Sequence, residues 1–97
     1  MSDFYIKIRG ENKAEAWVED YESVICTARL MTQGLEMCFI DTIETKPQYR
    51  RKGHAIFLIK ELQKIFKKVA PICVEPQAKE FWNKLGMEDA LGEEDEA

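Results

Sequence analysis

The chain has 97 residues, a net charge of −4 and a hydrophobic content of 45%, which suits one globular domain with a modest core. No apolar run approaches the roughly 18–20 residues of a membrane-spanning helix, and residues 1–10 hold no apolar run of signal-peptide length. We therefore expect a cytoplasmic protein without a membrane segment. The three cysteines, Cys26, Cys38 and Cys73, are widely spaced in apolar surroundings. This pattern predicts reduced, buried thiols rather than a disulfide framework or a metal site.

The charges are distributed unevenly along the chain. Residues 88–97 hold six acids and no base, whereas residues 1–87 hold 14 bases and 12 acids, a balance of +2. We therefore predict a single domain over residues 1–87, followed by an acidic tail over residues 88–97 that is a solvated chain end. A tail with a function of its own is the alternative.

The first half of the chain reads as strands joined by short connections. Residues 4–8 alternate between polar and apolar side chains, residues 16–20 form a brief second strand, and residues 24–31 are rich in β-formers. A turn at residues 32–34 leads to a long, mostly apolar strand over residues 35–45, which is typical of the centre of a sheet. The short connections favour antiparallel pairing of these four strands.

The hydrophobic period changes from two to 3.6 after Pro47, which predicts a helix over residues 51–69. A short apolar strand follows at residues 71–74, and a second helix is predicted over residues 76–86. A strand–helix–strand crossover requires this short strand and strand 35–45 to be parallel neighbours. The fold class is therefore α/β, with a mixed sheet and helices packed against it.

The connection between the long strand and the first helix, residues 47–55 (PQYRRKGHA), concentrates three cations around a glycine. A helix N-terminus leaves backbone N–H groups unpaired and carries a partial positive charge. Gly53 lets a ligand approach the backbone closely, and Ala55 is too small to obstruct it. This combination favours a diphosphate site, and a plain helix start with solvated cations is the alternative.

Two motifs resemble those of the GNAT (GCN5-related N-acetyltransferase) family. Its acetyl-CoA-binding signature is Gln or Arg, two residues, Gly, one residue, then Gly or Ala; here these positions are Arg50, Gly53 and Ala55, after a Pro-x-Tyr lead-in. Residues 78–87 (AKEFWNKLGM) resemble the family's second motif, A-x-x-F-Y-E-K-L-G-F, one strand further on. The resemblance covers residues 16–87. It implies a GNAT-like fold that lacks most of the family's N-terminal helices and C-terminal strands.

The resemblance also implies an acetyl-CoA-dependent N-acetyltransferase that acts on a primary amine of a protein or small molecule. Acetyl-CoA would lie where strands 35–45 and 71–74 separate. Backbone groups near Ile43, Glu44 and Thr45 would bond its pantetheine arm, and one N–H would stabilise the thioester oxyanion. The diphosphate would be held by the loop residues Arg50, Arg51, Lys52, Gly53, His54 and Ala55, with the His54 side chain pointing to solvent.

A carboxylate is expected to take the proton of the acceptor amine, whose reference pKa is about 10.4. The candidates are Asp41, Glu44 and Glu75. Asp41 interrupts an apolar strand, and an outward-facing aspartate is the alternative reading of that position. Glu44 lies near the strand end, where plain exposure is the alternative.

Several departures from the family pattern affect positions that carry catalytic residues in relatives. Trp82 stands where relatives carry the tyrosine that protonates the departing thiolate, Glu75 replaces an asparagine, and Phe39 replaces a glutamate base of some relatives. The elements that form the acceptor pocket are mostly missing. This openness suits a macromolecular acceptor, a pocket shared within a homodimer, or no acceptor.

Three functions therefore remain open. The first is the N-acetyltransferase. The second is a catalytically degenerate member of the family that acts by CoA binding or protein–protein interaction. The third is nucleic-acid binding by the cations of residues 50–52 together with Lys60, Lys64, Lys67 and Lys68. The overall acidity and the lack of interleaved aromatic residues disfavour it.

Overall fold

The computed structural model describes residues 2–72 and 76–87 of the chain. Five strands and two α-helices follow one another in the predicted order, with short 3₁₀ turns at Pro47–Tyr49 and Pro76–Ala78. The elements are β1 (Asp3–Gly10), β2 (Lys13–Asp20), β3 (Ser23–Gln33), β4 (Met37–Thr45), α1 (His54–Ile65), β5 (Lys68–Pro71) and α2 (Lys79–Lys84). Within these residues no helix is long and apolar enough to cross a membrane.

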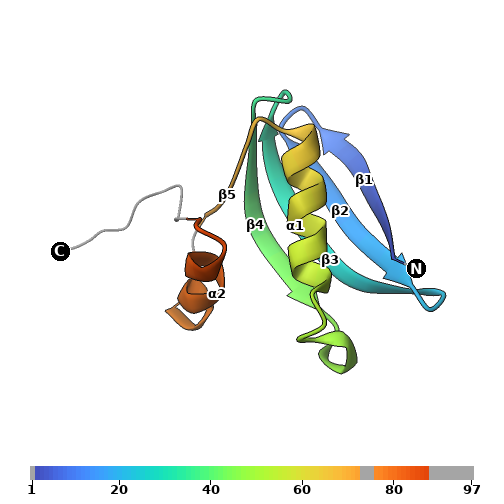
Figure 1. Ribbon diagram of the computed structural model, residues 1–97. Helices are drawn as coiled ribbons and strands as arrows, with labels where there is room; N and C mark the ends of the chain where they lie inside the picture. Colours follow the sequence, from blue (N-terminus) through green and yellow to red (C-terminus); the bar gives the residue numbers. More distant parts are fainter. Residues whose placement is uncertain (1, 73–75, 88–97) are drawn as a thin grey trace.

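The strands form one mixed sheet in the order β1-β2-β3-β4-β5 (Figure 1). The first four are antiparallel neighbours, whereas β5 pairs in parallel with β4, from Met37 opposite Lys68 to Ile40 opposite Pro71. This confirms the predicted crossover through α1.

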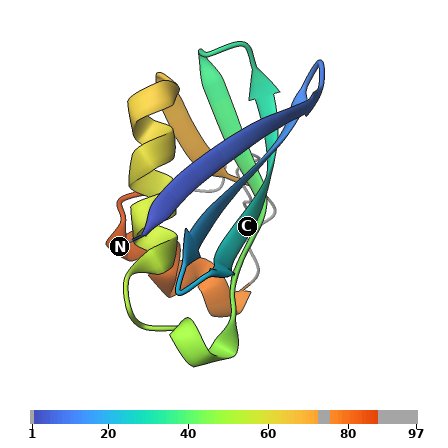
Figure 2. The ribbon, with the colours of Figure 1, turned by 90° about the vertical axis from the view of Figure 1, so that its right-hand side faces the viewer.

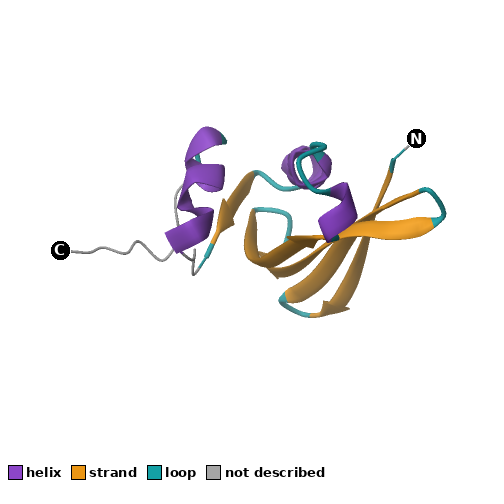
Figure 3. Cartoon of the chain, turned by 90° about the horizontal axis from the view of Figure 1, so that it is seen from below, coloured by secondary structure: helices purple, strands orange, loops and turns teal. Residues whose placement is uncertain are grey.

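The core lies between the sheet and α1, which runs along one face (Figures 1 and 2). Alternate residues of β2 point to that face, so Ala14, Ala16 and Val18 are buried against the apolar stripe of the helix. Leu58 and Leu62 of that stripe are fully buried. Seen from below, α1 lies above the sheet and α2 lies beyond its β5 edge, while no helix of the described chain covers the other face (Figure 3). We call this uncovered surface the open face.

The boundaries of α1 and β5 differ from the prediction. The helix begins at His54 rather than 51, because Arg51 (φ 64°) and Gly53 (φ 82°) adopt left-handed backbone conformations. It ends at Ile65 rather than 69, because Phe66 is already extended (φ −105°, ψ 146°). Phe66 and Val69 are still buried in the core, one at the end of the helix and one in β5. The apolar period therefore continued past the end of the helix.

The remaining boundaries also shift. β5 begins at Lys68, earlier than the predicted strand 71–74, whose residues 73 and 74 lie outside the described residues. The predicted helix 76–86 consists of a 3₁₀ turn followed by the six-residue α2. β1, β2 and β3 are longer than expected because their polar ends continue the pairing.

β4 extends beyond its partner β5. Their pairing stops at Ile40, whose carbonyl oxygen accepts one further hydrogen bond from the Ile72 N–H at 3.1 Å. The β3–β4 register also shifts at this point, because Ile40 pairs with Leu30 but Thr42 pairs with Arg29, which leaves Asp41 as the extra residue of a bulge. Within residues 2–72 and 76–87, no strand therefore pairs with the outer side of the second half of β4, which lies next to the start of α1.

Candidate functional site

The loop before α1 presents free backbone N–H groups. Gly53 is the N-cap of the helix in a left-handed conformation, and no side chain caps the helix. The first helical bond runs from the Phe57 N–H to the Gly53 carbonyl at 2.9 Å, so the amides of residues 54–56 have no acceptor within the helix. The first turn also contains no acidic residue. These features fit the binding of an anion.

A cavity of about 600 Å³ lies at this loop. Its walls come from the end of β4, the loop, the first turn of α1 and one side of α2. The lining residues are Ile43, Glu44, Thr45, Tyr49, Arg50, Arg51, Gly53, His54, Ala55, Ile56, Ala78, Phe81, Trp82 and Lys84. Most of the wall is apolar; Arg50 and Arg51 lie at the loop, and Lys84 lies on α2.

Of the eight residues predicted to hold the cofactor, seven line this cavity. The exception is Lys52, which is exposed and outside the lining. Arg50 donates a hydrogen bond from Nε to the carbonyl oxygen of Thr45 at 3.0 Å. This bond ties the loop to the end of β4 and fixes the guanidinium at the cavity rim.

His54 does not point to solvent, so that expectation was wrong. His54 is only 9% exposed. Its Nε2 atom is buried and has no hydrogen-bond partner among the described residues. The ring meets Tyr49 edge-on, with the centroids 6.3 Å apart, and Tyr49 in turn stacks on Tyr21 at 5.6 Å. The imidazole is buried because the first turn of α1 rotates it towards this aromatic cluster rather than outwards.

The candidate carboxylates have different positions. Glu44 is exposed and lines the cavity, whereas Asp41 is exposed on the bulge and is not part of the cavity wall. Glu75 lies outside the described residues. Of the three, Glu44 is therefore the one placed next to the loop before α1.

Trp82 faces the cavity as expected for its motif position. It is 6% exposed and packs edge-to-face against Phe81, with the ring centroids 5.0 Å apart. Sequence reasoning did not assign Ala78, Phe81 and Lys84 to the site, although Phe81 and Lys84 lie on α2 and Ala78 is its N-cap. The helical stripe that contains Trp82 was the signal available for them.

The two described cysteines, Cys26 and Cys38, are free and buried, as predicted. Burial raises the pKa of both thiols, that of Cys38 to about 12. The Thr45 hydroxyl donates to Cys26 Sγ at 3.3 Å. Neither thiol reaches the cavity, so neither is placed to supply a proton there.

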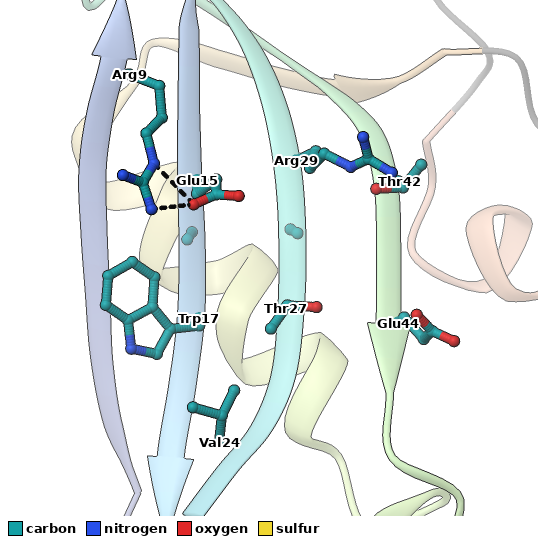
Figure 4. Close-up of a pocket in the computed structure, with 10 residues that line it drawn as sticks. Arg9, Glu15, Trp17, Val24, Thr27, Arg29, Thr42 and Glu44 are labelled. Atoms are coloured by element: carbon teal, nitrogen blue, oxygen red, sulfur yellow. Dashed lines mark hydrogen bonds and ion pairs between the residues drawn. The ribbon is translucent and has the colours of Figure 1, made fainter.

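A second cavity, of about 410 Å³, lies on the open face over β2, β3 and β4 (Figure 4). Trp17 forms part of its floor and donates from Nε1 to Glu19 at 2.8 Å. Arg9 binds Glu15 through Nε at 2.8 Å, while Arg29 forms no ion pair within the described chain and extends beside Thr42. Glu44 lines both this cavity and the one at the loop. The two cavities therefore share one lining residue, at the end of β4.

The fold is that of the acyl-CoA N-acyltransferases, and the solved structures similar to it are GNAT acetyltransferases. A ribosomal-protein-alanine N-acetyltransferase from Brucella melitensis biovar Abortus 2308 matches with a TM-score of 0.72 and 10% identity over 100% of this chain and 98% of its own. A GNAT-family acetyltransferase from Streptococcus pneumoniae TIGR4 matches with a TM-score of 0.65 and 18% identity over 91% of this chain and 88% of its own.

The aminoglycoside N-acetyltransferase AAC(6')-Iy in complex with CoA matches with a TM-score of 0.65 and 20% identity over 84% of this chain. This chain spans 63% of that enzyme's length. No protein-family model matches the sequence, and no curated protein matches it. At these identities the likeness establishes the GNAT fold.

Proposed function

We propose that the chain binds acetyl-CoA at the loop cavity and transfers the acetyl group to a primary amine. The observation that carries the proposal is that one cavity joins Gly53, the uncapped start of α1 and the second half of β4, whose outer side pairs with no strand of the described chain. The structurally similar aminoglycoside enzyme binds CoA, and a second structure of it holds a CoA-linked bisubstrate analogue. Both support the choice of acetyl-CoA.

In this proposal the diphosphate accepts hydrogen bonds from the amides of residues 54–56, and the cations of Arg50 and Arg51 offset its charge. The pantetheine arm follows the unpaired half of β4 in place of a longer β5. The acceptor amine attacks the thioester carbonyl carbon, the C–S bond breaks, and the departing thiolate takes up a proton.

Glu44 is the proposed group that receives the proton of the acceptor. It borders the loop cavity and also the cavity of the open face, from which an acceptor can approach. Asp41 offers a matched control, since it is an exposed carboxylate on the same strand outside both linings. The acceptor itself is a small-molecule or protein amine.

The test combines acetyl-CoA calorimetry with a thiol-release assay against a panel of amines. Wild-type protein should bind acetyl-CoA and release CoA thiol. Glu44→Gln should lower turnover by about 10²–10⁴-fold, the usual range for a general base, and keep its acetyl-CoA affinity, while Asp41→Asn should retain both. Loss of turnover in Asp41→Asn alone would overturn the assignment of Glu44.

A catalytically degenerate protein that only binds CoA is the second candidate, favoured by Trp82 in the usual tyrosine position. An indole cannot act as the acid for the thiolate, so an active enzyme would work without that group. Trp82→Tyr should then raise turnover, by up to about 10²–10⁴-fold, with little change in acetyl-CoA affinity. A binding protein would gain no turnover from the same substitution, which the thiol-release assay distinguishes.

A further inference from the structure

The outer edge of β1 is a long, unpaired strand edge. β1 spans eight residues and pairs only with β2, so its other side carries free backbone N–H and C=O groups within the described chain. The opposite edge, β5, is four residues long and ends at a proline. An exposed edge of this length is a template for pairing with another strand.

The sequence of β1 is complementary to itself when two copies run antiparallel. With Ile6 opposite Ile6 of the second copy, Phe4 meets Ile8, Tyr5 meets Lys7, and Asp3 meets Arg9. Directly opposed residues share a face of the sheet, so this register keeps apolar side chains together and opposes unlike charges at both ends.

The neighbouring registers are worse. A shift of two residues in one direction opposes Lys7 to its own copy, and a shift in the other direction leaves only residues 3–7 paired. A shift of one residue places apolar side chains on the polar face. Two copies of residues 3–9 therefore have one favoured antiparallel register, with Ile6 opposite Ile6.

Such pairing would reduce two unfavourable features of the single chain, an exposed apolar side chain and a pair of like charges. Ile8 is 65% exposed, although it lies on the same face of the strand as the partly buried Phe4 and Ile6. Asp3 stands opposite Glu19 on β2, a like-charge pair. A second copy would cover Ile8 with its own Phe4 and bring the partner's Arg9, which binds Glu15 within its own chain, next to Asp3.

We propose that two copies of this chain associate through β1 into a symmetric dimer with one continuous sheet. The two-fold axis runs perpendicular to the sheet through the Ile6 pair, so both α1 helices lie on one side and both open faces on the other. The two open-face cavities then belong to one surface. The pairing needs no acetyl-CoA and does not depend on the proposed activity.

Sedimentation velocity and light scattering of the full chain, from micromolar to a few hundred micromolar, test the proposal. The wild type should reach twice the monomer mass of 11.3 kDa. Ile8→Lys should raise the dissociation constant at least about tenfold, since symmetry counts the lost contact twice, without lowering the melting temperature of the monomer. Leu35→Lys is the matched control, because Leu35 is 66% exposed in the turn between β3 and β4, and β3 is two strands away from the β1 edge.

A charge exchange tests the register. Asp3→Arg opposes two cations across the axis and should weaken the dimer, yet it places a cation next to Glu19 and should not destabilise the monomer. The double variant Asp3→Arg/Arg9→Asp should recover part of the association, and its melting temperature is measured alongside because Arg9→Asp also removes the ion pair with Glu15. A wild type that stays monomeric throughout, a dimer that withstands Ile8→Lys, or the absence of recovery in the double variant would each overturn the proposal.

Discussion

At the scale of single residues, Gly53 carries the most specific expectation. A β-carbon there meets no atom within 4 Å, so space alone would admit a side chain, but the φ of 82° disfavours one. Gly53→Asp should cost about 1–2 kcal/mol in the free energy of unfolding. It should also weaken acetyl-CoA binding more than about tenfold, because a carboxylate then faces the diphosphate.

Gly34 provides the control for that substitution. It has a φ of 56° in the turn between β3 and β4, again with open space around its α-carbon. Gly34→Asp should therefore show a similar loss in denaturant unfolding but an unchanged acetyl-CoA affinity by calorimetry. If both variants bound acetyl-CoA equally well, the loop would not be the phosphate site.

The buried thiols lead to a second expectation at this scale. In a Cys73→Ser background, Cys26 and Cys38 should not react with a thiol reagent at pH 9 while the protein is folded, although a free thiol has a pKa of about 8.5. Both should react after unfolding. Because folding raises both pKa values, their contribution to stability is complete below about pH 8.5 and is lost as the pH rises towards 12, the pKa of Cys38. Rapid labelling of the native protein would contradict the burial.

At the scale of elements, the hydrophobic patterns predicted the order of the strands, the parallel crossover and the covering helix. The ends were less predictable. Phe66 and Val69 keep the helical spacing although the helix has ended at Ile65, because both still reach the core from an extended segment. The hydrophobic pattern predicts which side chains face the core, but it does not predict whether a helical or an extended backbone carries them.

The candidate site, like the fold, was predictable from the sequence only in part. The spacing of Arg50, Gly53 and Ala55 predicted the loop of the cavity, since these residues act through local backbone geometry. The contribution of Phe81 and the burial of His54 depend on how α2 and the aromatic cluster pack, which is a tertiary property. The open-face cavity could not be predicted from the sequence, because strand residues such as Trp17 and Arg29 have the pattern of an ordinary solvated face.

α2 should be the least stable element of the described fold. It has six residues, and the adjoining β5 is held to the sheet through four residue pairs, whereas β2 and β3 pair along most of their length. Amide hydrogen exchange should therefore be faster in α2 than in β2 and β3. Acetyl-CoA should slow exchange in α2 and the first turn of α1 most, and uniform slowing across the sheet would speak against a cavity bounded by α2.

At the scale of the whole molecule, the acidic residues 88–97 should affect binding through charge rather than through folding. Ending the chain at Met87, which is buried at 8% exposure, changes the net charge from −4 to +2. The melting temperature should stay the same. Acetyl-CoA affinity should rise by up to about tenfold at low ionic strength and converge with that of the full chain in high salt. A salt-independent difference in calorimetry would point instead to a direct contact of the tail.

The two tryptophans of the chain lie one at each cavity. Trp17 forms the floor of the open-face cavity and stacks on Tyr5 at 5.7 Å, while Trp82 is enclosed beside the cofactor loop. The protein therefore contains two intrinsic fluorophores whose emission reports on separate sites. In Trp17→Phe the remaining signal should follow occupancy of the loop cavity alone, and in Trp82→Phe it should follow the arrival of an acceptor on the open face. Stopped-flow fluorescence of the two variants can then determine the order in which acetyl-CoA and the acceptor bind, without an added label.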